Sequence, residues 1–240
     1  MIILPDIHGR TFWKNAVKGH ENDIIVFLGD YLDPYGHEGI SVEDAIANFE
    51  DIIQFKKDHN KNVILLLGNH DCGYIWPSVN SCRRSDKYYN DIHAMFRYNF
   101  DLFELAYQTE INGKKYLLSH AGIHKEWADL LLGIYKPEYL ASTLNNWLHT
   151  ADDDVIAEYL GIYSAYRGYT NNWHGSCVWA DVREWGTKER DNQLDNWGIY
   201  QIFGHTQLES KPIIHETFAC LDLRCGFTLD ESNEIKQIEE

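Results

Sequence analysis

Five short apolar runs, each followed closely by Gly, Asp, Asn or His, constrain the fold of this chain more than any other feature. The clearest run is 63–67, which leads without a spacer into Gly68-Asn69-His70-Asp71. A short run of β-branched residues and leucines that ends on glycine is typical of a buried parallel strand. The polar residues after it therefore lie at a strand's carboxyl end, where open α/β sheets place their ligands.

The other four runs follow the same pattern. They are residues 2–4 before Asp6 and His8, 24–28 before Asp30 and Asp33, 116–118 before Ser119 and His120, and 199–203 before Gly204 and His205. We expect all five strands to deliver these side chains to one rim. Carboxylates and imidazoles placed together suit a borderline divalent metal such as manganese, iron or zinc.

Each motif has more than one interpretation when it is taken alone. Asp30 can bridge two metals because a carboxylate has one oxygen for each, and Asp33 can orient a histidine. Asn69 offers a neutral oxygen ligand, whereas His70 is either a second ligand or an acid held by a carboxylate. The alternative for Asn69 is an ordinary turn residue with a positive φ angle.

The segments between the motifs predict the elements that support this rim. Residues 41–60 carry an apolar stripe at helical spacing, with Ser41 as the N-cap. Asn112-Gly113 is typical of a type I′ hairpin turn. After the fifth motif, we expect antiparallel strands within 211–238 to finish a second sheet.

Residues 124–198 differ in character from the rest of the chain, because six of its eight tryptophans lie there. We expect a helical, aromatic-rich, cap-like insertion beside the site. Its aromatic side chains favour a cap core over a platform for stacking bases. No Pro/Gly/Ser-rich linker divides the sequence, so residues 1–240 are expected to form a single domain.

Charge and cysteine content exclude several classes of function. The net charge of −16 argues against binding a long nucleic acid, and it would repel phosphate esters unless bound metal supplies positive charge. Five cysteines without a C-x-x-C pair favour reduced thiols in the cytoplasm. No segment is apolar enough to span a membrane. A nucleotide-cofactor enzyme is disfavoured, because no G-x-G-x-x-G follows the first strand.

The ordered motifs Asp-x-His, Gly-Asp-x-x-Asp, Gly-Asn-His-Asp, a strand-end histidine and Gly-His-Thr resemble the calcineurin-like metallophosphoesterase superfamily over nearly the whole chain. The run 119–123 (Ser-His-Ala-Gly-Ile) and Gln207, where many relatives carry a second histidine, make the chain most similar to the phosphoprotein-phosphatase branch. That branch contains protein Ser/Thr phosphatases and symmetrical dinucleoside-tetraphosphate hydrolases. The resemblance implies an α/β fold, a four-layer α/β/β/α sandwich, in which the insertion lies between the fourth and fifth motifs.

The resemblance also implies two divalent metals, with manganese preferred and iron or zinc as alternatives. The implied ligands are Asp6 and His8 for the first metal, Asp30 as the bridge, and Asn69, His120 and His205 for the second. His70 is implied as the proton donor to the leaving oxygen, oriented by Asp33.

The sequence departs from this family at Pro34, where protein phosphatases typically carry the arginine that grips the phosphate. Arg183 is the preferred replacement, because it closes the insertion and precedes the strand that ends at His205. Arg83 and Arg84 are the other arginine candidates, and a solvated loop is the alternative for both.

The function predicted from these features is metal-dependent hydrolysis of phosphomonoesters on proteins or small molecules, by in-line attack of a metal-bridging hydroxide. The alternative within this class is a nucleotide or dinucleoside-polyphosphate pyrophosphohydrolase. A different class is a non-catalytic scaffold that keeps the fold for protein interaction.

Overall fold

The protein is described by a computed structural model, which covers residues 1–79, 81–168, 173–185 and 197–238. Its strands are β1 (Ile2–Leu4), β2 (Ile25–Phe27), β3 (Val63–Leu66), β4 (Phe103–Glu104), β5 (Ala106–Ile111), β6 (Lys114–Ser119), β7 (Tyr200–Phe203), β8 (Ile213–Ile214), β9 (Phe218–Cys220), β10 (Phe227–Leu229) and β11 (Ile235–Gln237). Its α-helices are α1 (Phe12–Ala16), α2 (Val42–Asp58), α3 (Asn69–Ile75), α4 (Tyr89–Tyr98), α5 (Lys125–Leu132), α6 (Leu140–Thr150) and α7 (Asp153–Leu160). Short 3₁₀ turns are η1 (Gly36–Glu38), η2 (Phe100–Leu102), η3 (Pro137–Tyr139) and η4 (Val182–Glu184).

The strands form two sheets. The six-stranded sheet has the order β11-β10-β1-β2-β3-β4, and the five-stranded sheet has the order β5-β6-β7-β9-β8. β1 to β4 pair in parallel, as do β6, β7 and β9. The carboxyl ends of β1, β2 and β3 therefore meet at one edge of the first sheet, as the sequence predicted.

The apolar residues of the strands alternate between two cores. Along β1, Ile3 faces the second sheet and packs in a cluster with Leu118 and Ile202, whereas Ile2 and Leu4 pack in the cluster that includes α2 residues such as Phe49. This alternation follows from the two-residue period of a strand. It buries both faces of the first sheet.

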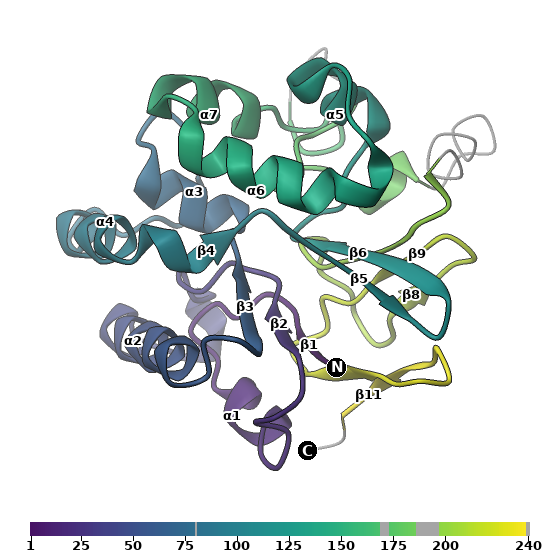
Figure 1. Ribbon diagram of the computed structural model, residues 1–240. Coiled ribbons are helices and arrows are strands. Elements are labelled where there is room, and N and C mark those ends of the chain that lie inside the picture. Colours follow the sequence, from purple (N-terminus) through teal and green to yellow (C-terminus); the bar gives the residue numbers. More distant parts are fainter. Residues whose placement is uncertain (80, 169–172, 186–196, 239–240) are drawn as a thin grey trace.

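The arrangement in space is the expected α/β/β/α sandwich. Figure 1 shows α1, α2 and α4 on the outer side of the first sheet, α5 and α6 on the opposite side of the molecule next to the second sheet, and α7 above α3. Several local predictions are also confirmed. Ser41 caps α2 by accepting a hydrogen bond from the Asp44 amide, and Asn112 and Gly113 adopt the positive φ angles of the β5–β6 hairpin.

The predicted tail is partly wrong. Within 211–238, β8 and β9 belong to the second sheet, but β10 pairs antiparallel with β1 and β11 extends the first sheet. β9 also runs parallel to β7, not antiparallel. The Met1 amino group donates to the Leu229 carbonyl, so a hydrogen bond joins the residue before β1 to the end of β10 in the first sheet.

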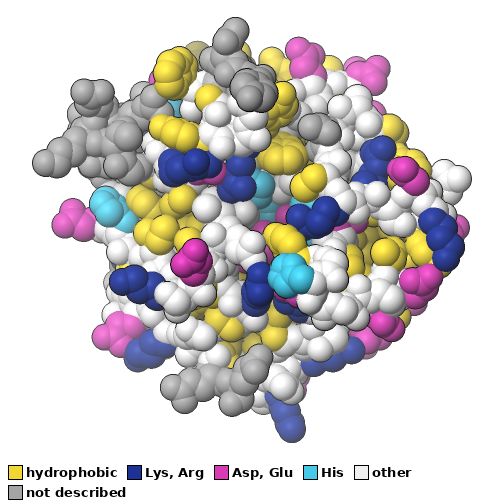
Figure 2. Space-filling view, turned by 180° about the vertical axis from the view of Figure 1, so that it is seen from behind, with side chains coloured by type: hydrophobic (Ala, Val, Ile, Leu, Met, Phe, Trp, Pro, Cys, Tyr) yellow, Lys and Arg dark blue, Asp and Glu magenta, His cyan; other side chains and the backbone are white. Residues whose placement is uncertain are grey.

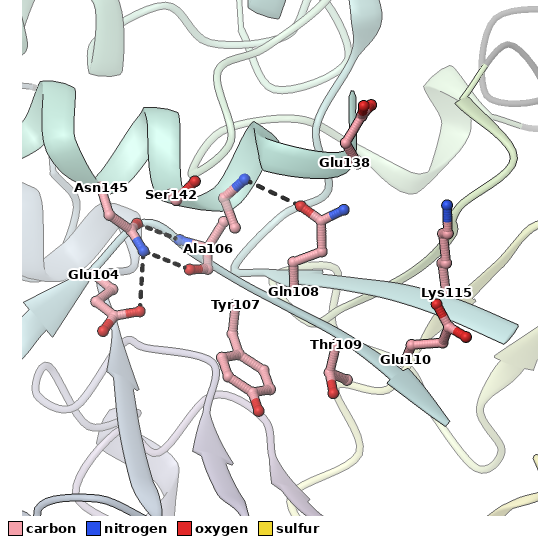
Figure 3. Close-up of a pocket in the computed structure, with 11 residues that line it drawn as sticks. Glu104, Ala106, Tyr107, Gln108, Thr109, Glu110, Lys115, Glu138, Ser142 and Asn145 are labelled. Atoms are coloured by element: carbon pink, nitrogen blue, oxygen red, sulfur yellow. Dashed lines mark hydrogen bonds between the residues drawn. The ribbon is translucent and has the colours of Figure 1, made fainter. Parts of the chain in front are cut away.

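The region predicted as an insertion, 124–198, contains α5, α6, α7 and η4. Residues 169–172 and 186–196 lie outside the described part, so the boundaries of a cap stay a prediction. Figure 3 shows how α6 is fixed to β5: the Asn145 side chain bonds the backbone of Ala106 and the Glu104 carboxylate, and Gln108 accepts from the Ala141 amide. The pocket drawn there is lined by none of the predicted site residues.

Two expectations about cellular context can be compared with the structure. Among the described residues, no disulfide joins any of the five cysteines. Within the described residues, no helix has both the length and the apolar character needed to cross a bilayer.

Candidate metal centre

The six predicted metal ligands all follow strand ends and lie on tightly turned backbone. Three of them, His8, Asp30 and His205, have left-handed φ angles of 45°, 53° and 62°. Residues other than glycine adopt this conformation rarely, and Asp and His tolerate it better than most. Each turn aims a polar side chain back across the end of the sheet instead of along its strand.

Two glycines allow these turns to touch one another. A Cβ atom on Gly68 would lie 2.1 Å from the Asp30 Oδ1 atom, and one on Gly204 would lie 2.3 Å from the Asp6 Oδ1 atom. No side chain fits at such distances. Glycine is therefore required before Asn69, where the Asp30 carboxylate lies against the backbone, and before His205, where the Asp6 carboxylate does so.

Asp71 fixes the β2 and β3 turns to each other, a role that sequence reasoning missed. Its fully buried carboxylate accepts hydrogen bonds from the amides of Gly68 (2.8 Å), Asp30 (2.8 Å) and Tyr31 (3.1 Å). The sequence offered one signal for this role, a carboxylate that follows a strand-end glycine by one turn. Two of its three partners, Asp30 and Tyr31, lie about forty positions away in the sequence.

His120 supplies the strongest evidence for a cation. Its Nδ1 atom lies 2.8 Å from the Leu28 carbonyl, which can only accept, so Nδ1 donates to it and Nε2 faces the cluster. That Nε2 atom lies 3.1 Å from the Asn69 Oδ1 atom and 3.1 Å from the His205 Nδ1 atom. Three side chains therefore bring nitrogen and oxygen donors to one point, an arrangement that suits a shared divalent cation.

His8 has the same arrangement on the other side of Asp30. The His8 Nδ1 atom donates to the Leu32 carbonyl at 2.8 Å, which leaves the Nε2 lone pair facing the Asp30 Oδ2 atom at 3.6 Å. The His120 Nε2 atom lies at the same distance from that oxygen. Asp30 is thus placed between the two histidines, as expected of a bridging ligand.

Ligand atoms within 4.8 Å of one another form two groups that share Asp30. One contains Asp6, Asp30, His120 and His205, and the other contains His8, Asp30 and His70. The residues fit a pair of divalent cations, since oxygen and imidazole donors suit manganese, iron and zinc. Two features differ from the predicted split. Asp6, expected beside His8, lies in the group of His120 and His205, and His70, expected as the proton donor, lies in the group of His8.

The charge states of His8 and Asp30 suit cation binding. Burial lowers the pKa of His8 to about 3, so its ring is neutral. Burial would raise the pKa of Asp30, but the positive charge of neighbouring histidines, His120 first, outweighs it and lowers that pKa to about 2. A neutral His8 ring beside an ionised Asp30 carboxylate is the combination that binds a metal.

His70 is held differently from the other histidines. Its Nδ1 atom lies 2.7 Å from the Asp33 Oδ2 atom, and its Nε2 atom lies 3.5 Å from the Cys82 sulfur. Burial would lower the pKa of His70, but the Asp30 charge and the Asp33 hydrogen bond raise it to about 10 in the metal-free protein. This pairing is the one that the sequence predicted for a proton donor.

Of the three predicted arginines, Arg83 lies closest to the cluster. One of its terminal nitrogens lies 3.5 Å from both ring nitrogens of His8, its Nε atom donates to the Asp33 carbonyl at 3.2 Å, and its guanidinium lies 3.9 Å from the centre of the Tyr35 ring. Among the described residues, no carboxylate forms an ion pair with it. Arg84 lies in the same loop, bound to the Gly73 carbonyl.

Arg183, the preferred candidate, is occupied elsewhere. It makes two hydrogen bonds to the buried Asp181 carboxylate, at 2.7 and 2.9 Å, and one to the Tyr166 carbonyl. No contact joins it to the metal ligands in the part of the chain that the structure describes. Arg167, which sequence reasoning missed, shares Asp181 and donates to Thr206 next to His205. Figure 2 shows Lys and Arg side chains around a hollow in which histidine and acidic side chains are visible.

Comparison with known proteins agrees with this geometry. The model of the calcineurin-like phosphoesterase family matches residues 3–208. Among curated proteins, no sequence matches this chain.

Solved structures with a similar fold include two phosphatases. A cold-active protein-tyrosine phosphatase of a psychrophilic Shewanella species is similar with a TM-score of 0.59 and 15% identity, over 99% of this chain and 80% of that one. A protein serine/threonine phosphatase from Saccharomyces cerevisiae is similar with a TM-score of 0.53 and 17% identity, over 92% of this chain and 65% of that one. At these identities the likeness shows a shared fold.

Proposed function

Because the chain belongs to the calcineurin-like phosphoesterase family, we propose that it hydrolyses phosphomonoesters with two divalent cations bound at the strand ends. The observation that carries this proposal is the convergence of imidazole nitrogens and side-chain oxygens on Asp30. The His8 and His120 Nε2 atoms each lie 3.6 Å from one Asp30 oxygen, and the Asn69 oxygen lies 3.1 Å from His120. A non-catalytic scaffold would have no need to keep such an array buried.

The cations would supply a water nucleophile at neutral pH and positive charge for the phosphoryl oxygens. The chain's own residues hold them and complete the reaction. Asp6, His8, Asp30, Asn69, His120 and His205 are the proposed ligands. His70 gives a proton to the leaving oxygen through Nε2, while Asp33 holds Nδ1 and fixes the direction of the ring.

We assign the phosphate grip to Arg83. Its guanidinium reaches the cluster beside His8, is exposed to substrate, and is held flat on the Tyr35 ring. A planar fork of donors without a carboxylate partner suits bidentate binding of phosphate oxygens.

The substrate class within this family rests on the phosphoprotein-phosphatase resemblance. The two fold relatives named above are a protein-tyrosine phosphatase and a protein serine/threonine phosphatase. We therefore favour a phosphomonoester on a protein or small molecule, with manganese as the preferred metal. A pyrophosphohydrolase acting on nucleotides or dinucleoside polyphosphates is the second candidate.

The test is turnover of p-nitrophenyl phosphate by protein stripped of metal and then supplied with manganese, iron or zinc. A phosphoester panel of phosphopeptides, nucleotides and dinucleoside polyphosphates would follow at the best metal. Metal-dependent turnover with two metals per chain supports the proposal, and a preference for polyphosphates would select the second candidate. Full metal occupancy with no turnover of any substrate would favour the scaffold.

A further inference from the structure

Tyr74 extends the contact between His70 and Asp33 into a buried chain of three side chains. Its hydroxyl donates to the Asp33 Oδ1 atom at 2.6 Å, while His70 binds the other oxygen of the same carboxylate at 2.7 Å. All three residues are almost completely buried. Both carboxylate oxygens are thus committed, one to each neighbour.

The direction of the Tyr74 proton is also fixed. The Ser85 amide donates to the Tyr74 oxygen at 2.8 Å, so that oxygen accepts one hydrogen bond and must turn its own proton toward Asp33. Hydrogen bonds to a charged acceptor are stronger than neutral ones. The hydroxyl therefore holds the Asp33 carboxylate in one orientation.

The same contact ties down the loop that carries the phosphate-binding arginine. Each residue of 82–85 is attached to α3 or to Asp33. Cys82 lies against His70, Arg83 donates to the Asp33 carbonyl, Arg84 donates to the Gly73 carbonyl, and Ser85 donates to Tyr74. Asp33 and Arg83 also have left-handed φ angles of 60° and 62°, which the backbone keeps only when surrounding contacts hold it.

We propose that Tyr74 is a positioning residue that joins the proton donor and the phosphate grip into one unit. It lies one helical turn after His70, so both side chains leave the same face of α3. Through Asp33 it sets the direction in which His70 presents Nε2, and through Ser85 it sets the position of Arg83. This inference rests on the proposed function and deepens it.

The test exploits the fact that a proton donor matters most for poor leaving groups. p-Nitrophenolate leaves without much help from an acid, whereas phenolate needs a proton. Tyr74→Phe keeps the buried ring and removes only the hydroxyl. We expect kcat for phenyl phosphate to fall about 10- to 100-fold, the effect of a lost hydrogen bond to a charged group, and kcat for p-nitrophenyl phosphate to fall less than about threefold.

The matched control is Tyr116→Phe, which removes another buried tyrosine hydroxyl, hydrogen-bonded to Asn233 between the sheets. It should leave the ratio of the two substrates unchanged. A second readout does not depend on activity: the Ser85 amide should exchange with deuterium at least about tenfold faster in Tyr74→Phe than in the unmodified protein. The KM for both substrates should rise as well, because Arg83 loses its support.

The possible outcomes separate this inference from the proposed function. Equal losses on both substrates, or a substrate ratio like that of Tyr116→Phe in an active variant, would refute the positioning role alone. Unchanged Ser85 exchange would refute the link to the loop. No metal-dependent turnover by the unmodified protein would refute the proposed function and, with it, the acid that Tyr74 is inferred to position.

Discussion

Replacing Arg83 by alanine tests which arginine binds the phosphate. On this assignment the structure favours Arg83, whereas the sequence favoured another arginine. The sequence favoured Arg183 for the phosphate grip, but Arg183 is bound to Asp181 through two hydrogen bonds, whereas Arg83 lies against His8. Arg83→Ala removes the guanidinium and leaves the backbone of the loop in place. We expect kcat/KM to fall while metal content stays the same.

The magnitude follows from the contacts that phosphate would gain. One or two hydrogen bonds from a guanidinium to a phosphate oxygen contribute about 1.5–3 kcal/mol each, and each 1.4 kcal/mol changes the rate about tenfold. Arg83→Ala should therefore lower kcat/KM by about 10- to 10⁴-fold. Arg83→Lys should recover little of this, because an ammonium lacks the planar fork and its stacking on Tyr35.

Arg183→Ala and Arg84→Ala are the matched controls. Arg183 is largely exposed, with 57% of its side chain accessible, and the buried Asp181 carboxylate keeps Arg167 as a partner without it, so its loss should change kcat/KM less than about threefold. All variants should be measured on p-nitrophenyl phosphate at one saturating metal concentration. Inhibition by inorganic phosphate should weaken in parallel for Arg83→Ala only.

Two results would refute this reasoning. Activity within threefold in Arg83→Ala, together with a collapse in Arg183→Ala, would return the grip to Arg183. A loss of bound metal in Arg83→Ala would show that the arginine supports the ligand His8 and not the substrate.

Three further changes probe the rest of the centre. Asp30→Asn should abolish metal-dependent hydrolysis and lower the metal content below two per chain, because an amide cannot give two anionic oxygens; two metals with normal turnover would contradict the bridge. His70→Asn should lower kcat about 10²- to 10⁴-fold with metal content kept, and loss of metal with unchanged turnover per metal would make it a ligand. Asp71→Asn should destabilise the fold by about 1–3 kcal/mol in urea denaturation, because the Asn side chain has one acceptor oxygen for three backbone N–H groups. An unchanged midpoint would show that Asp71 does not stabilise these two turns.

The sequence predicted that these side chains meet at the strand ends, because each proposed ligand follows a run whose meaning is local. Apolar residues at 63–67 mark a buried strand whatever the rest of the chain does, and parallel strands bring their ends together. The pairing of His70 with Asp33 came from the family resemblance, and the structure places the two side chains 2.7 Å apart.

The arginines show where such reasoning stops. Arg183 precedes the strand that ends at His205, and nearness in sequence favoured it, but the buried Asp181 carboxylate binds its guanidinium first. Arg83 reaches the proposed metal centre because its own backbone is left-handed and because its guanidinium packs on the ring of Tyr35, which lies about fifty positions earlier in the sequence. No periodic pattern encodes either feature, so a loop arginine and a surface arginine look the same in the sequence.

The same physical reason explains why Asp71 and Tyr74 were missed. Both act on backbone that is left-handed at residues other than glycine, a conformation that costs about 1–3 kcal/mol at each position. Asp30 and Asp33 carry that cost, and Asp71 and Tyr74 offset it with hydrogen bonds to the Asp30 amide and the Asp33 carboxylate. Site residues with a strained backbone therefore need supporting residues on a neighbouring element, which here is α3. The supporting residues lie within the motif Gly68-Asn69-His70-Asp71 or shortly after it, because Asp71 is its last residue and Tyr74 follows three positions later.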